Sequence, residues 1–255
     1  MPGPLPDHHA ESLSRILAAV EADARFDAIL GAGSMIHGGF DEHSDLDLVL
    51  VVRDDDYAEV LESRHAIAQV LGDLLAAFTG EYVGEPRLLI CLYGPPLIHV
   101  DLKFVRLADL AAMIERPRIL WARTPADVAG RIDTAAVAWP NKDPQWFEDR
   151  AWVWLHYCAA RLLRGELFEA IGMLGFFREN VLGPMLRQAA GEPQRGVRRI
   201  DGEAEAVALR GTHPAYDGAE IARALGRSIE LYQANPPLAL VRHMPETLRR
   251  MVEAE

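Results

Sequence analysis

The first 125 residues interleave two patterns of apolar positions, one typical of helices and one typical of strands. From Glu11 to about Ala24 the apolar residues recur every three or four positions, which predicts an amphipathic helix. The run Leu46–Val52 is continuous and rich in β-branched residues, as a buried strand is. The same patterns predict a hairpin turn at Gly94-Pro95-Pro96, further strands at 26–30, 87–93, 97–105 and 119–122, and further helices at 54–78 and 107–114.

After Pro125 only helical patterns follow. Asp143-Pro144 is typical of a helix start, with an N-cap carboxylate followed by proline at the first helical position. A second helix is predicted from about 166 to 182, ending at Gly183-Pro184; an arginine-bearing loop then covers 191–199, and shorter helices are separated by breaks at 235–237 and Pro245.

These patterns predict an α+β protein. We expect a small mixed β-sheet domain with flanking helices at 11–125 and an all-helical C-terminal domain at 143–255. Residues 126–142 are expected to form a hinge, and residues 1–10, with His8 and His9, a frayed tail rather than a docked arm.

Composition narrows the class of protein. The formal net charge is −12, from 26 Lys and Arg against 38 Asp and Glu, which argues against a nucleic-acid partner because a phosphate backbone needs a basic surface. No apolar run reaches the roughly 20 residues that a membrane helix needs, so no membrane partner is expected. Cys91 and Cys158 lie far apart in apolar runs, which favours buried free thiols and a cytoplasmic location.

Two carboxylates lie within the otherwise apolar strand region near residue 46. Residues two apart on a strand point to the same face, so Asp45 and Asp47 project together, about 7 Å apart along the backbone. Paired charges at the end of a buried strand are costly without a cation, and carboxylate oxygens are ligands that Mg²⁺ prefers. Two Mg²⁺ ions held here would suit a phosphoryl-type displacement.

A third carboxylate and a glycine turn add to this pair. In the alternating run after Leu97, Asp101 points away from the apolar positions, as does Lys103, which either neutralises the site or contacts phosphate. Gly33-Ser34 follows a predicted strand, where glycine lets the backbone approach a phosphate and the Ser34 hydroxyl donates to it. Each feature alone is more often a plain turn or a solvated strand end; the combination favours a functional site.

Gly33-Ser34, Asp45-Leu46-Asp47 and Asp101 together resemble the signature of the DNA polymerase β-type nucleotidyltransferase superfamily. The resemblance covers about 26–104 and implies that Asp45 and Asp47 bind two metal ions, that Asp101 binds one of them, and that Ser34 binds a nucleoside triphosphate. An arginine often follows the Gly-Ser pair in this superfamily. Met35 stands there in this chain, so an arginine contact to phosphate has to come from elsewhere.

The layout, a mixed sheet followed by helices, resembles the antibiotic-modifying branch, that of the aminoglycoside nucleotidyltransferases. The segment 166–172 is locally similar to the catalytic-base helix of kanamycin nucleotidyltransferase, which implies that Glu169 is the general base. The lysine expected one turn later is replaced by Met173, and a solvated or salt-bridged Glu169 is the alternative. Asp101 is the other candidate for taking the proton from the acceptor.

Other polar and aromatic residues are given plain structural interpretations. The histidines near the site are interpreted as incidental or as lying behind the carboxylates, because histidine is a poor Mg²⁺ ligand, and the tryptophans as core packing. The C-terminal arginines are interpreted as solvated. These residues are His37, His43 and His99; Trp121, Trp139, Trp146, Trp152 and Trp154; and Arg161, Arg164, Arg195, Arg198 and Arg199.

The resulting hypothesis is a Mg²⁺-dependent transfer of a nucleoside monophosphate, AMP from ATP or the equivalent from another NTP, to a hydroxyl of a small molecule. An acidic cleft would suit a cationic acceptor such as an aminoglycoside-like antibiotic. The alternatives are a degenerate nucleotidyltransferase domain that serves as a nucleotide-binding or interaction module, and a metal-dependent glycosyltransferase with an Asp-x-Asp motif. The sequence leaves the oligomeric state open, a homo-oligomer included.

Overall fold

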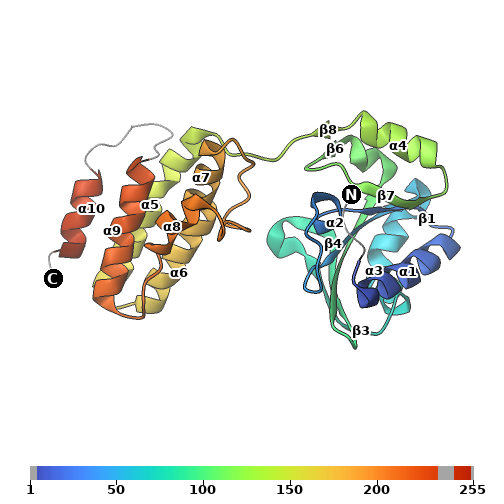
Figure 1. Ribbon diagram of the computed structural model, residues 1–255, viewed down its shortest axis with the longest axis horizontal. Helices are drawn as coiled ribbons and strands as arrows, with labels where there is room; N and C mark the ends of the chain where they lie inside the picture. Colours follow the sequence, from blue (N-terminus) through green and yellow to red (C-terminus); the bar gives the residue numbers. More distant parts are fainter. Residues whose placement is uncertain (1–4, 235–243, 254–255) are drawn as a thin grey trace. The chain divides into compact units, whose positions relative to one another are not determined.

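The computed structural model describes residues 5–234 and 244–253. The chain divides into two compact units, Met1–Ala138 (unit 1) and Trp139–Glu255 (unit 2), and each is described by itself (Figure 1). No helix in the described parts has the length and apolar character that crossing a bilayer requires.

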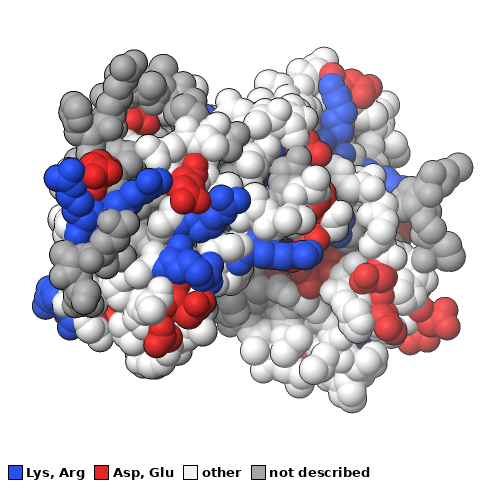
Figure 2. All heavy atoms as spheres, turned by 60° about the vertical axis from the view of Figure 1, so that its left-hand side comes forward, with Lys and Arg blue, Asp and Glu red and all other residues white. Residues whose placement is uncertain are grey.

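The two units differ in charge. Unit 1 holds 22 of the 38 acidic residues but 11 of the 26 basic ones, whereas unit 2 holds 16 acidic and 15 basic residues. Figure 2 shows basic side chains gathered on the left of the view, with acidic ones among them. The negative charge of the chain therefore belongs almost entirely to unit 1.

Unit 1 is built on a six-stranded mixed sheet. The strand order is β3-β4-β5-β2-β1-β7; β2 and β5 are parallel, and the other neighbours are antiparallel. Because β5 follows β4 in a hairpin but pairs with β2, the two central strands come from distant parts of the chain. The strands are β1 (Phe26–Gly31), β2 (Leu46–Val52), β3 (Leu74–Gly80), β4 (Glu85–Tyr93), β5 (Ile98–Arg106) and β7 (Arg118–Ala122).

The two faces of this sheet are covered differently. Helices α1 (Asp7–Ala22) and α3 (Tyr57–Val70) pack on one face, against alternate strand residues such as Leu48 and Leu102 (Figure 1). On the other face, α4 (Pro125–Asp133) and the 3₁₀ turn η3 (Leu107–Ala111) share a smaller core with β1, β2 and β5. Toward the start of β2 and β5, this second face carries polar side chains instead.

The remaining elements of unit 1 are short. A two-stranded parallel sheet joins β6 (Ala112–Met113) to β8 (Ala136–Val137). The others are α2 (Ser34–His37) and the 3₁₀ turns η1 (Asp54–Asp56) and η2 (Glu81–Val83).

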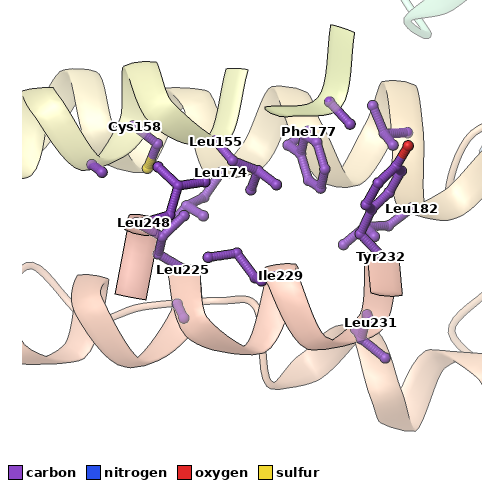
Figure 3. Close-up of a cluster of buried hydrophobic side chains, with 14 of the residues drawn as sticks. Leu155, Cys158, Leu174, Phe177, Leu182, Leu225, Ile229, Leu231, Tyr232 and Leu248 are labelled. Atoms are coloured by element: carbon purple, nitrogen blue, oxygen red, sulfur yellow. The ribbon is translucent and has the colours of Figure 1, made fainter. Parts of the chain in front are cut away.

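In its described residues, 139–234 and 244–253, unit 2 is built of helices and loops, with no strand. Asp143 caps α5 as predicted: its carboxylate accepts a hydrogen bond of 2.8 Å from the Trp146 N–H. Apolar side chains of α5, α6, α9 and α10 form one core, in which Leu155, Leu174 and Ile229 point toward one another (Figure 3). The helices are α5 (Pro144–Leu163), α6 (Leu167–Phe177), α7 (Gly183–Ala189), α8 (Ala204–Arg210), α9 (Gly218–Ala234) and α10 (Met244–Glu253), with a π-helical turn (Arg178–Leu182) between α6 and α7.

The predicted fold class is confirmed, as are the strand at 46–52 and the hairpin at Gly94-Pro95-Pro96. The helix predicted through Phe78 is wrong in its second part, because the helix ends at Val70 and Leu74–Gly80 pairs with β4 as an edge strand. The helix predicted at 107–114 is a 3₁₀ turn followed by β6, since the chain leaves the helical conformation to pair with β8.

Three further boundaries differ from the prediction. The chain continues through Gly183-Pro184 into α7, where Pro184 lies in the first turn and needs no N–H partner. Helix α1 begins at Asp7, inside the predicted tail, and α4 occupies part of the segment 126–142 in which we expected the hinge. The predicted break at 235–237 lies outside the described residues, and α10 begins one residue before Pro245.

Candidate active site

Parallel pairing of β2 with β5 brings two of the predicted carboxylates side by side. Asp47 and Asp101 are direct partners in the register of the two strands. Partners on adjacent strands lie about 5 Å apart and point to the same face. The Asp101 side chain is 25% exposed, so its charge is partly removed from water. Two carboxylates in this arrangement repel each other unless a cation or a hydrogen-bond donor lies between or beside them.

His99 contacts both Asp101 and the third predicted carboxylate. Its Nδ1 lies 3.2 Å from Asp45 Oδ1, and its Nε2 lies 3.0 Å from Asp101 Oδ1. The hydrogen bond with Asp101, helped by the negative charges of Asp45 and Asp47, raises the pKa of His99 above its ordinary value, although burial acts in the opposite direction. Of the two interpretations given to His99, the contacts match a place behind the carboxylates rather than an incidental one, because its ring bridges two of the candidate metal ligands.

The same ring affects how the carboxylates could hold a metal. In the described parts of the chain, no three side chains of His, Cys, Asp or Glu converge as a metal cage. Asp45, Asp47 and Asp101 supply the oxygen donors that suit Mg²⁺. The His99 imidazole lies between Asp45 and Asp101, so a cation shared by these two carboxylates requires the ring to turn aside.

The glycine turn packs directly over Asp47. Gly33 has φ 58°, a conformation that side chains disfavour, and a Cβ at this position would lie 2.0 Å from Asp47 Oδ2. The Ala32 N–H donates to the Asp47 carbonyl oxygen over 2.9 Å. Ser34, 6% exposed, then begins α2. Only glycine fits where the turn approaches the carboxylate. The Gly33-Ser34 turn and the Asp45-Leu46-Asp47 motif are therefore in direct contact.

Glu115 is the residue in this region that the sequence did not reveal. The Gly33 N–H donates to Glu115 Oε1 over 2.8 Å, and His37 Nε2 lies 2.6 Å from Glu115 Oε2. Glu115 follows β6 in a short irregular segment with no periodic pattern, and its role depends on a contact 82 residues away in the chain. No signal in the sequence alone singles it out.

The loop before Asp45 is held by residues that we predicted to be a frayed tail. His9 is 2% exposed, its Nε2 lies 2.8 Å from the Ser44 carbonyl oxygen, and its ring packs edge-on against Phe40. Burial lowers the pKa of His9, against the raising effect of the hydrogen bond with Ser44. The expectation of a frayed tail is wrong for His9, because α1 begins early enough to bury it against this loop.

Lys103 shares the sheet face of Asp101 but contacts a carboxylate of its own. Its Nζ lies 2.7 Å from Glu85 Oε2, and Arg87 Nε donates to Glu85 Oε1 over 2.7 Å. The hydrogen bond from Arg87, joined by the one from Lys103, lowers the pKa of Glu85 to about 2. The predicted contact between Lys103 and a phosphate would therefore have to compete with this ion pair.

Glu169 lies on α6 of unit 2 and is 58% exposed. It accepts a hydrogen bond of 2.7 Å from the Tyr157 hydroxyl, and Arg161 Nε lies 3.8 Å away. This hydrogen bond raises the pKa of Tyr157. The local structure matches the salt-bridged alternative for Glu169, while its role as general base stays a prediction. Arg161 and Arg164 both pair with Glu166.

Several of the C-terminal arginines and tryptophans contact each other. Trp152 is buried in the helical core, as predicted, and Trp146 packs edge-on against Trp154. The Arg195 guanidinium lies over the Trp139 ring, 5.0 Å from its centre.

Comparison with known proteins found similarity among solved structures. No protein-family model matches the chain, and no curated protein matches it. Among solved structures, an aminoglycoside 6-adenyltransferase from Bacillus subtilis is similar, at 15% sequence identity and a TM-score of 0.37, over 94% of this chain and 96% of that one. The TM-score is too low for this similarity to support a function, so the proposed function rests on the residues of the site.

Proposed function

We propose that this protein is a Mg²⁺-dependent nucleotidyltransferase that moves a nucleoside monophosphate, AMP from ATP, to a hydroxyl group of a small molecule. The observation that supports this most is the alignment of Asp47 with Asp101 on adjacent parallel strands, directly beneath the Gly33 turn. Three carboxylates beside a backbone turn provide what phosphoryl transfer needs, namely sites for cations and donors for phosphate.

Each residue has a distinct role in this proposal. Asp45, Asp47 and Asp101 would hold two Mg²⁺ ions, which, when bound, neutralise phosphate charge during the transfer. The Gly33 N–H and the Ser34 hydroxyl would bind phosphate oxygens. Asp101 or Glu169 takes the proton of the acceptor hydroxyl.

The charge of unit 1 supports a cationic acceptor. Its acidic residues outnumber its basic ones two to one, so its field attracts cations toward the carboxylates. We propose an aminoglycoside-like compound as the acceptor class, a cytoplasmic location, and no nucleic-acid or membrane partner.

A non-catalytic nucleotide-binding module is the second candidate, and two observations favour it. His99 already bridges Asp45 and Asp101, and the described residues contain no ready metal cage. In this alternative the imidazole replaces the cations permanently. A glycosyltransferase with an Asp-x-Asp motif is less well supported, because it leaves the close approach of Gly33 to Asp47 unexplained.

The deciding experiment incubates the protein with labelled NTPs, Mg²⁺ and a panel of acceptors, and measures both label transfer and release of pyrophosphate. We expect Asp47→Asn to lower transfer by about 100-fold or more, the scale of losing one strong electrostatic contact in a transition state. Asp55→Asn, an exposed carboxylate of the same unit, is the matched control and should leave transfer unchanged. Equal transfer by wild type and Asp47→Asn would remove this carboxylate from the mechanism. Binding of NTP without transfer to any acceptor would favour the non-catalytic module.

A further inference from the structure

The Gly33 turn holds an anionic group of the protein itself. The Gly33 N–H, to which the proposed function assigns a phosphate oxygen, donates to Glu115 Oε1 over 2.8 Å. The second carboxylate oxygen, Oε2, lies 2.6 Å from His37 Nε2, on the last residue of α2. The Glu115 side chain is 17% exposed, so it packs against the turn and does not extend into solvent.

A carboxylate and a phosphate make the same kind of contact at such a position. Both present charged oxygens that accept short hydrogen bonds from backbone N–H groups. One N–H points in one direction and cannot serve two acceptors equally well, and two anions at one donor repel each other. A phosphate oxygen that binds the Gly33 N–H must therefore displace Glu115 or lie beside its charge.

We propose that Glu115 sets the affinity of this site for polyphosphate by competing with the substrate for the Gly33 N–H. The inference rests on the proposed function, since it takes the Gly33 turn as the phosphate-binding element. In the absence of nucleotide, Glu115 satisfies a backbone donor that would otherwise lose its partner, and it holds the turn in shape over Asp47. Nucleotide binding releases Glu115 from the turn, at a cost in affinity.

The surroundings allow this release. Glu115 lies in the irregular segment between β6 and β7, whose backbone is not tied into the main sheet. On the other side of the contact, His37 is followed by Gly38 and Gly39, which have φ of 80° and 73° and no atom within 4 Å of an added Cβ. The His37 side chain is 40% exposed, so the contact between Glu115 and His37 opens toward solvent.

The test compares binding of Mg²⁺-ATP and of Mg²⁺-tripolyphosphate to the full chain by isothermal titration calorimetry. Glu115→Gln keeps an oxygen that accepts from the Gly33 N–H but removes the charge that opposes the triphosphate. We expect it to bind both probes roughly three- to tenfold more tightly than the wild type, about the effect of one charge near a partly solvated site. His37→Asn, which frees Glu115 Oε2, should shift affinity in the same direction by a smaller factor. Glu62→Gln, an exposed glutamate on α3 on the far side of the sheet, is the matched control and should bind like the wild type.

The possible outcomes separate the inference from the function on which it rests. Wild-type binding with equal or weaker binding by both Glu115→Gln and His37→Asn would show that Glu115 supports the turn rather than competing for it, which overturns the inference and leaves the proposed function standing. No binding of either probe by the wild type, Glu115→Gln or Glu62→Gln would overturn both.

Discussion

The two units differ in how their charged side chains find partners. In unit 2, the buried Glu148 accepts hydrogen bonds from Trp152 Nε1 and the Tyr232 hydroxyl, and the buried Arg187 pairs with Glu192. Each of these charges has permanent partners within the fold. In unit 1, Asp45 and Asp101 share one histidine, beside Asp47 and in a unit with twice as many acidic as basic residues.

This difference is the one expected if the proposed site lies in unit 1. Charges whose partners are built in serve to specify the fold, and their loss costs stability. Carboxylates gathered on one sheet face with few built-in cations are costly to the fold, and a ligand that supplies positive charge relieves that cost. We therefore expect that neutralising the buried Glu148 of unit 2 harms stability, whereas neutralising a carboxylate of the unit 1 site harms ligand binding and activity.

The largest expected effect on stability is in unit 2. Glu148→Ala leaves the Trp152 N–H and the Tyr232 hydroxyl buried without an acceptor, so we expect the free energy of unfolding to fall by about 3 kcal/mol. Glu148→Gln retains an acceptor oxygen and should cost about 1 kcal/mol. Urea denaturation followed by tryptophan fluorescence measures this, since four of the five tryptophans lie in unit 2. A decrease of less than about 1 kcal/mol in the free energy of unfolding of Glu148→Ala would contradict the proposed difference between the units.

A pair of glycine variants tests the contact between the turn and the carboxylate in unit 1. Gly33 and Gly38 both have a positive φ with a ψ outside the left-handed helical region, but a Cβ at Gly33 would lie 2.0 Å from Asp47 Oδ2, whereas a Cβ at Gly38 meets no atom within 4 Å. Gly38→Ala should therefore cost about 1–2 kcal/mol from backbone strain alone, and Gly33→Ala about 1 kcal/mol more, together with loss of Mg²⁺-ATP binding. Thermal unfolding and calorimetric binding check both. Equal stability and intact binding in the two variants would contradict the close approach.

A smaller effect depends on pH. The pKa of Glu85 is lowered to about 2 by Arg87 and Lys103, so the ionised carboxyl stabilises the folded state. This contribution is complete above the ordinary glutamate pKa near 4.5 and is lost as the pH falls toward 2. At pH 6, Glu85→Gln should be less stable than the wild type by about 1–2 kcal/mol, and the gap should close near pH 2. A gap that stays constant between pH 6 and pH 2.5 in urea titrations would show that the charge of Glu85 does not contribute.

The sequence was sufficient for those parts of unit 1 that depend on local pattern. The short run Leu46–Val52 holds three valines, which favours a buried strand, and the alternation around Asp101 placed that residue opposite the apolar positions. The in-register pairing of Asp47 with Asp101 could not be read in this way, because β2 and β5 are joined through two other strands and a helix. The edge strand β3 was missed because its short apolar run follows α3 almost directly and shows no clear alternation.

Residues whose roles come only from tertiary contacts were missed or misjudged. His9 and Glu115 reach the site from 35 and 78 or more positions away, and neither lies in a pattern that predicts burial or contact. For His99 a signal was present, since alternation put it on the same face as Asp101 and next to it. The low preference of Mg²⁺ for histidine argued only against a place among the metal ligands, and the alternative behind the carboxylates is where the ring lies.

Asp101 and its neighbours are proposed to bind the metal-nucleotide complex. The most direct measurement is calorimetric titration of ATP into the wild type, Asp101→Asn and the control Asp55→Asn, each with and without Mg²⁺. We predict that the wild type and Asp55→Asn bind ATP only when Mg²⁺ is present, and that Asp101→Asn binds it at least about tenfold more weakly, as expected when a metal ligand is lost. If Asp101→Asn binds ATP as tightly as the wild type, with the same dependence on Mg²⁺, the account of this site is contradicted.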